Sequence, residues 1–470
     1  MIRSVDKYII SERYRLRKEK NNISLYRINE VYGVDAVELL HPTQAIILAL
    51  FDGNRTLKSI YNEVKYLFEI EEQQLTILEN IIDDFVKKKI IVPKESECSE
   101  KEYKRYNPEE FILPKSEIRF ETPRLSRPLE IVWHLTENCT CNCIYCYNEK
   151  PLFENKHCLN SRRIIELGQE MVSMQINDVQ FSGGDPLLYP DIYKILTLLC
   201  KNSISVYLST KSFIDESKAD MLALSGLNLI QLSIDSLDPN KCFIINGQVG
   251  HGLKMLQSIE YLKKRGFRVN INTVVTSLNI AEVPIIIERL KDLGVNRIGI
   301  AQYGKSIFNH HDFLFPNNNE VQKLIEIIEG YKTRGIPVYY SGAQDPGLLS
   351  YEEKEKTFFN RPRCGGLFYG CVIYPDGKLS ICEQLPINSP FRWGDLTNTS
   401  LYETWNDEKF LEILYPKREY FRGSVCYTCE IFEECNSKIG RCIRNTLQAF
   451  NNYWMPDPRC PKAPMGERIM

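Results

Sequence analysis

The distribution of cysteines constrains this chain more than any other feature of its sequence. The chain has 16 cysteines in 470 residues, and most of them fall into three groups. The groups are Cys139, Cys143 and Cys146; Cys364, Cys371 and Cys382; and Cys426, Cys429, Cys435, Cys442 and Cys460. The N-terminal sequence lacks a signal-peptide pattern, so we expect a cytoplasmic protein. Cytosolic thiols are kept reduced, and grouped cysteines there indicate metal binding more often than disulfides.

Length and composition indicate a soluble protein of several domains. A chain of 470 residues exceeds what one hydrophobic core serves. Hydrophobic residues make up 43% and charged residues 26%, which is typical of globular proteins. The formal net charge of -2 gives no electrostatic reason to bind nucleic acid or a membrane. No apolar run is long enough to span a bilayer. We therefore expect neither a nucleic-acid nor a membrane partner.

The hydrophobic pattern divides the chain into three domains and a linker. Residues 1–95 combine short strands with three helical segments, which predicts a small unit of winged-helix type. Residues 96–128 are charged and rich in proline, which indicates a linker. Residues 129–345 alternate six strands with helices, which predicts an α/β fold, a parallel sheet closed into a partial (β/α)6 barrel. Residues 346–470 have weak periodicity and eight cysteines, so we expect metal to order this domain.

The first cysteine group has the spacing C-x3-C-x2-C within ENCTCNCIYCYN. It follows the first barrel strand directly, which places it at the carboxyl end of the sheet. The thiolates of Cys139, Cys143 and Cys146 can bind three irons of a [4Fe–4S] cluster and leave the fourth iron open. The alternative is a zinc site, but zinc normally takes four ligands and no fourth ligand is evident. Cys141, inside the loop, has no assigned role.

This spacing resembles the radical S-adenosylmethionine (radical SAM) superfamily. In that family the open iron binds S-adenosylmethionine, and one electron cleaves it to a 5′-deoxyadenosyl radical. The resemblance implies that Tyr145 packs on the adenine of the cofactor. It also implies that Gly183, Gly184 and Asp185, at the end of the second strand, form the glycine-glycine-acid motif that receives the amino group.

The resemblance extends to later strands, with one departure. Ser233 and Asp235 on the fourth strand resemble the ribose contacts of the family. Asn272 on the fifth strand is a further candidate, and strand packing is the alternative. Related maturases place an arginine about a dozen residues after this serine, whereas Ile245 and Asn246 stand here. The carboxylate of S-adenosylmethionine therefore has no assigned partner.

The C-terminal cysteines resemble the SPASM domain, which binds two auxiliary [4Fe–4S] clusters, giving three clusters with the first group. In that domain the ligands interleave. The implied inner set is Cys364, Cys371, Cys382 and Cys442, and the implied outer set is Cys426, Cys429, Cys435 and Cys460. Six residues separate Cys435 from Cys442 where three is usual, which loosens the assignment of Cys442. The alternative is a pair of zinc knuckles.

The N-terminal unit resembles the RiPP recognition element, a winged-helix module. Such modules bind the leader of a ribosomally synthesised precursor peptide as an added strand. A winged helix can also bind DNA, but acidic residues such as Glu30, Asp35 and Glu38 are interspersed with the basic ones. No basic face is apparent, so peptide binding is the favoured interpretation.

Together the resemblances imply a radical SAM peptide maturase, an oxidoreductase that forms cross-links in a precursor peptide. A low-potential donor such as flavodoxin or ferredoxin would supply electrons. The preferred product is a thioether from a cysteine sulfur to carbon, as in sactipeptides and ranthipeptides. The alternatives are a carbon–carbon cross-link, formylglycine formation by a sulfatase-type maturase, and a zinc-binding winged-helix regulator.

Three further residues lie near these motifs in the sequence. Glu383, directly after Cys382, stands where sulfatase-maturating relatives have a proposed catalytic base. The alternative is that Glu383 is a surface charge. Trp133 and His134, in the first strand, are expected in the core.

Overall fold

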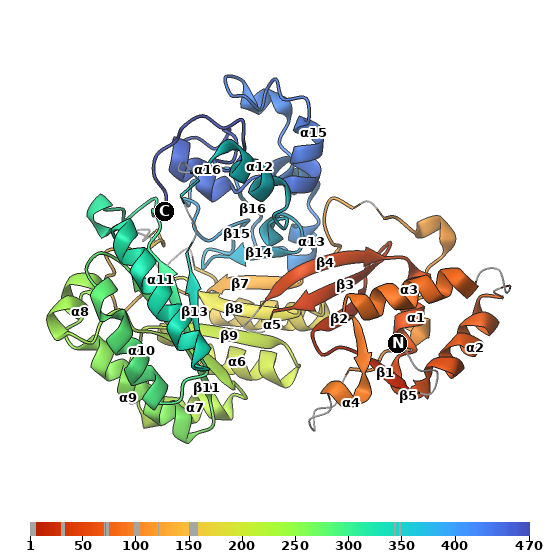
Figure 1. Ribbon diagram of the computed structural model, residues 1–470, viewed down its shortest axis with the longest axis horizontal. Coiled ribbons are helices and arrows are strands. Elements are labelled where there is room, and N and C mark those ends of the chain that lie inside the picture. Colours follow the sequence, from red (N-terminus) through yellow and green to blue (C-terminus); the bar gives the residue numbers. More distant parts are fainter. Residues whose placement is uncertain are drawn as a thin grey trace. The chain divides into compact units, whose positions relative to one another are not determined.

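The computed structural model describes residues 6–29, 33–69, 71, 75–97, 104–120, 122–149, 158–342, 345–346 and 349–470. The chain forms two compact units, Met1–Ser126 and Arg127–Met470. Each unit has a hydrophobic core of its own, so each is described separately. Figure 1 shows the elements coloured along the chain.

The first unit combines two small antiparallel sheets with helices. The sheets have the strand orders β5-β1-β6 and β2-β3-β4. The strands are β1 (Lys7–Ile10), β2 (Tyr14–Lys18), β3 (Ile23–Ile28), β4 (Val34–Leu40), β5 (Asp52–Thr56) and β6 (Ile91–Pro93). The helices are α1 (Pro42–Ala49), α2 (Leu57–Leu67), α3 (Leu75–Lys87) and α4 (Lys94–Glu97). Helices α2 and α3 each bury one apolar stripe, which is why their period of three to four residues was readable in the sequence.

Part of the predicted linker belongs to this first unit. Phe111 lies in a short 3-10 helix (Pro108–Phe111) and is 2% exposed within the core of the unit. The Tyr106 hydroxyl accepts a hydrogen bond from the backbone nitrogen of Leu16 on β2 (3.0 Å). The backbone nitrogen of Arg119 donates to the carbonyl of Asn21 (2.9 Å). Because only isolated residues anchor this stretch, its sequence has no hydrophobic period. Its charges and prolines therefore resemble those of a flexible linker.

The second unit is built on a single sheet with the order β13-β12-β11-β10-β9-β8-β7-β14-β15-β16. The six strands predicted for the barrel are all present and parallel, which confirms the partial barrel. They are β7 (Glu130–His134), β8 (Asp178–Ser182), β9 (Ser205–Thr210), β10 (Leu229–Ser233), β11 (Arg268–Val275) and β12 (Arg297–Gln302).

Four strands of the second unit's sheet were not predicted, and three of them come from the cysteine-rich region. Strand β13 (Val338–Ser341) adds in parallel to β12. Strand β14 (Gly370–Ile373) adds in parallel to β7, with Cys371 opposite Ile131. Strands β15 (Leu379–Ser380) and β16 (Arg392–Trp393) continue the sheet in antiparallel pairs. The barrel and the cysteine-rich region therefore share one sheet.

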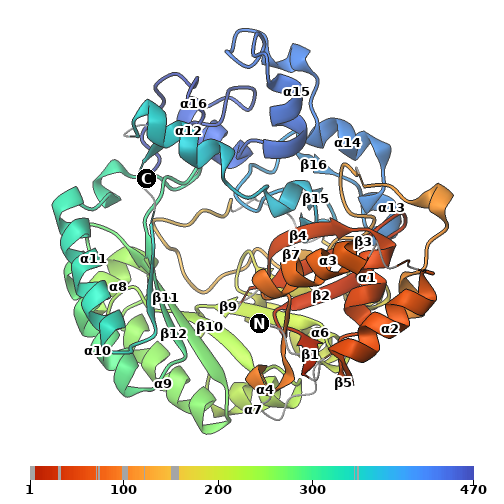
Figure 2. The same ribbon diagram turned by 45° about the vertical axis from the view of Figure 1, so that its right-hand side comes forward.

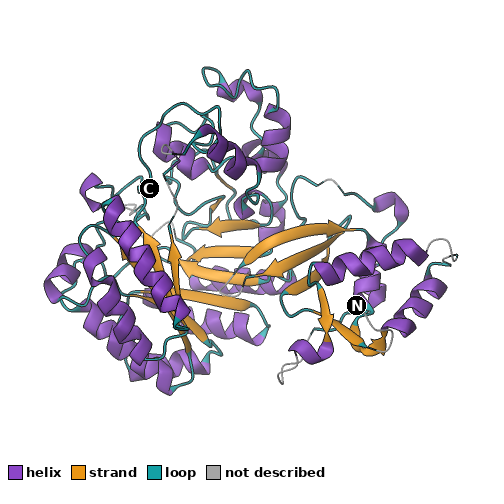
Figure 3. Cartoon of the chain, viewed as in Figure 1, coloured by secondary structure: helices purple, strands orange, loops and turns teal. Residues whose placement is uncertain are grey.

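Helices cover the outer side of the barrel strands, as Figures 2 and 3 show for α8 to α11. The barrel helices are α5 (Ser161–Ser173), α6 (Ile192–Lys201), α7 (Glu216–Leu224), α8 (Pro239–Asn246), α9 (His251–Lys264), α10 (Val283–Asp292) and α11 (Asn318–Thr333). The C-terminal helices are α12 (Tyr351–Phe359), α13 (Leu401–Trp405), α14 (Glu408–Leu414), α15 (Phe432–Glu434) and α16 (Ile443–Phe450). None of the helices in the described part has the length and apolar character needed to cross a bilayer.

Candidate functional site

The loop with the first cysteine group lies at the carboxyl end of β7 and is held by the end of α8. The backbone nitrogen of Asn142 donates to the carbonyl of Asn246 (2.8 Å), and that of Ile144 donates to the carbonyl of Ile245 (3.0 Å). Ile245 and Asn246 stand where related maturases have the arginine. In this chain the position supports the cysteine loop through its backbone.

Two glycines after β8 let that strand's end approach the cysteine loop closely. Gly183 has a φ of +98°, and a Cβ there would come within 2.6 Å of the His134 ring. A Cβ on Gly184 would lie 2.6 Å from the carbonyl carbon of Glu137. The backbone nitrogen of Gly184 donates to the carbonyl of Thr136 (3.0 Å). A larger residue would therefore push the cysteine loop away from β8.

The Asp185 carboxylate binds the loop that follows β9. It accepts hydrogen bonds from the Thr210 hydroxyl (2.7 Å) and from the backbone nitrogens of Lys211 (3.0 Å) and Ser212 (2.8 Å). Asp185 is 2% exposed. The carboxylate expected to receive an amino group thus also fixes the position of Lys211, a role that the sequence did not indicate.

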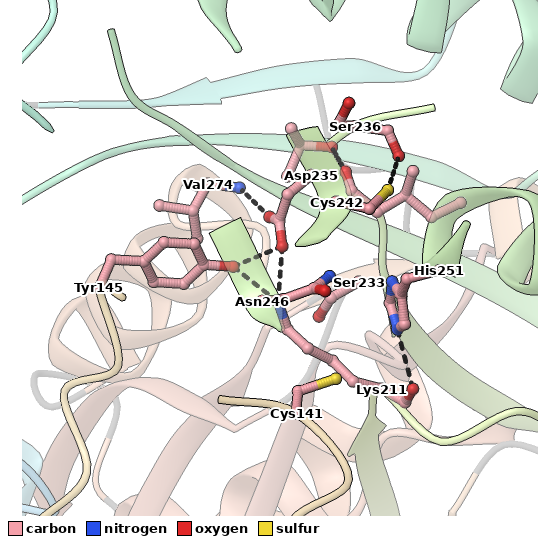
Figure 4. A network of polar contacts seen from close by, with 12 residues as sticks. Cys141, Tyr145, Lys211, Ser233, Asp235, Ser236, Cys242, Asn246, His251 and Val274 are labelled. Carbon is pink, nitrogen blue, oxygen red and sulfur yellow. Dashed lines mark hydrogen bonds and ion pairs between the residues drawn. The ribbon is translucent and has the colours of Figure 1, made fainter. Parts of the chain in front are cut away.

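Three side chains from separate strand ends meet in a buried network, shown in Figure 4. The Lys211 ammonium donates to Asp235 Oδ2 and to the Tyr145 hydroxyl, both at 2.6 Å. Tyr145 also donates to Asp235 Oδ2 (2.5 Å). The other oxygen of Asp235 accepts from the backbone nitrogen of Val274 (3.1 Å). Burial raises the pKa of Asp235, but the Lys211 charge and the hydrogen bonds from Lys211, Tyr145 and Val274 together outweigh it, so the pKa lies below its usual range.

The structure brings Tyr145 and Asp235 together as the motif resemblance implies, and it adds Lys211. Ser233 is 9% exposed at the end of β10 and lies within the same view. Asn272 is half-buried on β11, and its carbonyl accepts from the backbone nitrogen of Ile234 (3.1 Å). The cofactor contacts of Ser233 and Asn272 stay predictions.

A second polar cluster joins the end of β7 to the C-terminal region through Glu383. Glu383 Oε2 accepts from the Ser182 hydroxyl (3.0 Å) and lies 3.3 Å from His134 Nε2. The Tyr147 hydroxyl lies 3.0 Å from Ser182 Oγ. Burial lowers the pKa of His134, but the nearby carboxylates of Glu137 and Glu383 outweigh it and raise the pKa to about 9.

The structure corrects one alternative for Glu383 and refines the expectation for His134. Glu383 is not a surface charge, because only 21% of its side chain is exposed and its carboxylate is engaged. Whether it acts as a base stays a prediction. His134 is fully buried as expected, yet it also pairs with two carboxylates. The sequence gave no sign of this pairing, since Glu383 is 249 residues away.

The outer cysteine set surrounds one cavity of about 230 Å³ in the C-terminal region. Its walls include Phe358, Phe432, Arg441 and the four thiols of Cys426, Cys429, Cys435 and Cys460. Burial raises the pKa of Cys426 to about 11 and that of Cys435 to about 12. Cysteine thiols release their protons when they bind a metal, and a buried arginine suits an anionic cluster. The donor set and the cavity fit an iron–sulfur cluster.

The inner set converges from separate elements. Cys364 and Cys442 both act electrostatically on Cys382, which lies two residues after the end of β15. The backbone nitrogen of Cys442 donates to Asp457, whose carboxylate also pairs with Arg361 (3.1 Å). Among the described residues, no three Cys, His, Asp or Glu side chains converge closely enough to hold one metal ion.

The unusual spacing between Cys435 and Cys442 has a structural reason. Cys435–Ile439 form a single π-helical turn, and Gly440 follows with a φ of +69°. The wider turn and the glycine carry the chain from the outer cysteine set to Cys442. With these added residues, Cys442 still acts electrostatically on Cys382 of the inner set.

Comparisons with known proteins agree with this geometry. Residues 133–284 match the radical SAM superfamily, and residues 364–430 match an iron-sulfur cluster-binding domain known as SPASM. The chain is 23% identical over 360 residues to a PqqA peptide cyclase of Gluconobacter oxydans, covering 73% of this chain and 93% of the relative. It is 22% identical over 382 residues to an Fe-coproporphyrin III synthase of Methanosarcina barkeri, covering 76% and 92%.

A solved structure shares the fold over almost the whole chain. SuiB of Streptococcus suis bound to S-adenosylmethionine has a TM-score of 0.64 at 18% identity, covering 96% of this chain and 99% of SuiB. SuiB bound to its precursor peptide SuiA has a TM-score of 0.60. The shared fold comprises small N-terminal sheets, a partial radical SAM barrel and a C-terminal SPASM domain.

Proposed function

We propose that this chain, a radical SAM enzyme with a C-terminal SPASM domain, forms an oxidative cross-link in a ribosomally synthesised precursor peptide. The observation that carries the proposal is the shared sheet, in which Cys371 lies on β14 beside β7. The cysteine loop begins at the end of β7, so the auxiliary and radical sites are built on adjacent strands. This arrangement suits a reaction that removes two electrons from one substrate.

The residues of the chain hold, orient and shield the reactants. Cys139, Cys143 and Cys146 would ligate the first cluster, and the C-terminal cysteines would ligate two auxiliary clusters. When bound, the cluster and S-adenosylmethionine supply a radical that abstracts hydrogen from the peptide. Glu383, whose carboxylate contacts Ser182 and His134, would accept the proton that the substrate loses. A flavodoxin or ferredoxin would deliver the electron.

The first unit supports a peptide as the substrate. In its described part, β4 pairs with β3 alone, whereas Tyr106 covers the outer edge of β2. An edge strand of a sheet can take an extended leader as an added strand. A cavity of about 290 Å³ on this sheet offers space for a side chain of that leader. It is lined by Tyr14, Leu25, Arg27, Ala36, Glu38 and Lys88.

We retain a thioether from a cysteine sulfur to carbon as the proposed product. The PqqA peptide cyclase is named for closing a ring in its peptide, and this similarity makes a carbon–carbon link the chief alternative. Formylglycine formation is a further alternative, since a buried carboxylate beside the site would serve that chemistry as well. The two cross-links share the loss of two hydrogens, and they differ in whether a cysteine thiol is consumed.

The test is incubation of the anaerobically reconstituted protein with S-adenosylmethionine, a low-potential reductant and the short peptide encoded beside its gene. We expect 5′-deoxyadenosine and a peptide lighter by two hydrogens. Alkylation with iodoacetamide then separates the products, because a thioether leaves one cysteine unlabelled and a carbon–carbon link leaves all of them reactive.

Two controls accompany this experiment. Cys143→Ala should abolish both products, while Cys200→Ala, which removes a thiol from α6 outside all three groups, should keep them. The same core peptide without its leader should react far more slowly. A protein that carries zinc and no iron, or one that leaves the peptide mass unchanged, would contradict the proposal.

A further inference from the structure

The described site has a cation on its cofactor side that no motif accounts for. Lys211 follows β9 directly, and its side chain is 17% exposed. Its backbone nitrogen is fixed by Asp185, and its carbonyl lies 2.9 Å from His251 Nε2. The backbone of Lys211 is thus held at its nitrogen and at its carbonyl, which fixes where the side chain begins.

The ammonium lies between the cysteine loop and the ribose side of the site. Lysine has three N–H donors. Two are directed at Tyr145 and Asp235, and the positive charge of Lys211 also acts on the Cys143 thiol. If Cys143 ligates iron, the Lys211 ammonium would lie near the cluster and near a ligand bound to it.

The position that related maturases use for the carboxylate carries no cation here. Asn246 is 1% exposed, and its side chain accepts from the backbone nitrogen of Gln248 (3.0 Å). Its carbonyl supports the cysteine loop at Asn142. Neither Asn246 nor Ile245 can supply positive charge, so a bound carboxylate needs another partner.

We propose that Lys211 binds the carboxylate of S-adenosylmethionine and so replaces the absent arginine. The inference rests on the use of this cofactor in the proposed function. Asp235 and Tyr145 hold the ammonium in place, and the carboxylate completes its hydrogen bonding. A lysine presents a compact charge with rotatable donors, which allows one ammonium to serve Asp235 and a ligand together. The alternative is that Lys211 only neutralises buried Asp235.

Equilibrium binding of two ligands separates these roles without using turnover. S-adenosylmethionine and its decarboxylated analogue differ only in the carboxylate. Their dissociation constants would be measured by anaerobic equilibrium dialysis on the reconstituted full chain and on Lys211→Met. We expect the variant to bind S-adenosylmethionine roughly 10- to 100-fold more weakly, the range for a hydrogen-bonded charge pair. Its affinity for the decarboxylated analogue should change by less than about threefold.

Two further variants serve as controls. Lys218→Met removes an ammonium that donates to the Phe213 carbonyl (3.0 Å) in the same region, and both affinities should stay as in the wild type. If Lys211→Met loses iron, Lys211→Gln is measured instead, because its amide keeps a donor for Asp235 without the charge. Equal weakening of both ligands, or no weakening of either, would overturn the inference. A wild-type protein that binds no S-adenosylmethionine would instead contradict the proposed function.

Discussion

At the scale of single residues, close backbone approach decides the geometry of the site. Gly184 lies against three consecutive residues of the cysteine loop, from Thr136 to Asn138. These contacts are with backbone atoms, which cannot rotate away as a side chain can. The same loop carries Cys139 one residue later. The position of the first iron ligand therefore depends on the absence of a Cβ at Gly184.

We predict that Gly184→Ala impairs the first cluster selectively. The added methyl displaces the cysteine loop, and a misplacement of this kind lowers the rate of S-adenosylmethionine cleavage by roughly 100-fold. Iron bound by the C-terminal cysteines should be retained. The matched control is Gly330→Ala, whose Cβ meets nothing within 4 Å on exposed α11. That variant should be stabilised by about 0.5 to 1 kcal/mol with unchanged cleavage. Normal cleavage in Gly184→Ala would contradict the close-packing argument.

His251 gives a pH-dependent prediction. Burial lowers its pKa below the ordinary 6.5, and its buried Nδ1 has no hydrogen-bond partner among the residues that the structure describes. Since protonation is disfavoured in the folded state, the stabilisation is fully present above pH 6.5 and is lost as the pH falls below it. Urea unfolding at pH values on either side should show a larger loss of stability for the wild type than for His251→Gln. His311→Gln, at an exposed site, should behave as the wild type does.

The motif resemblance assigned Tyr145 and Asp235 to one cofactor site, and the structure joins them by a hydrogen bond. Both follow parallel strands, and parallel strands end at one edge. Lys211 was missed because no motif contains it, although its place directly after the third strand was a signal. The hydrogen bonds that Asp185 accepts from Thr210 and Lys211 could not be predicted from the sequence. They join residues 25 or more positions apart, which only the fold brings together.

At the scale of elements, the predicted strands are those with a continuous apolar run. Strands β7 to β12 are buried on alternate positions or throughout, so the pattern revealed them. Strand β14 has four residues and begins with a glycine, and β15 and β16 have two residues each. Elements of this length carry no period, and only the pairing of β14 with β7, of β15 with β14 and of β16 with β15 defines them.

The contact between the short 3-10 helix Gly365–Leu367 and the end of β15 gives a prediction for the inner cysteine set. A Cβ on Gly366 would overlap the carbonyl oxygen of Ile381, which precedes Cys382. Gly366→Ala should therefore separate Cys364 from Cys382. We expect a loss of about four of about twelve irons per chain, the content of one [4Fe–4S] cluster. The measurement is iron content with electron paramagnetic resonance. Gly330→Ala again serves as control, and full iron content in Gly366→Ala would contradict the assignment.

At the scale of the whole molecule, the sequence predicted the order of the domains better than their boundaries. The change from helical periodicity to a cysteine-rich pattern located the C-terminal domain. It did not show that β14 joins the barrel sheet, because pairing between distant strands leaves no local mark. The end of the first unit was placed too early for a related reason, since Phe111 and Tyr106 are anchored by contacts far away in the sequence.

The shared sheet leads to the last prediction, which concerns the outer cysteine set. If this set holds an electron acceptor, it needs full ligation, and the first cluster can still cleave S-adenosylmethionine without it. Cys435→Ala removes a thiol from the wall of the cavity of about 230 Å³. We expect about four irons fewer per chain, continued formation of 5′-deoxyadenosine, and cross-linked peptide reduced at least roughly tenfold.

A purely structural role of the outer set predicts a different pattern for the same variant. The loss of ligation would then unfold the domain around the cavity, whose walls include Phe358 and Phe432. Peptide binding and iron at the inner set would fall together with the product. Iron content, 5′-deoxyadenosine, peptide mass and peptide affinity are therefore measured on one preparation, with Cys200→Ala as the matched thiol control. A folded Cys435→Ala protein that lacks only the outer cluster and still makes normal amounts of product would show that electrons leave the substrate by another route.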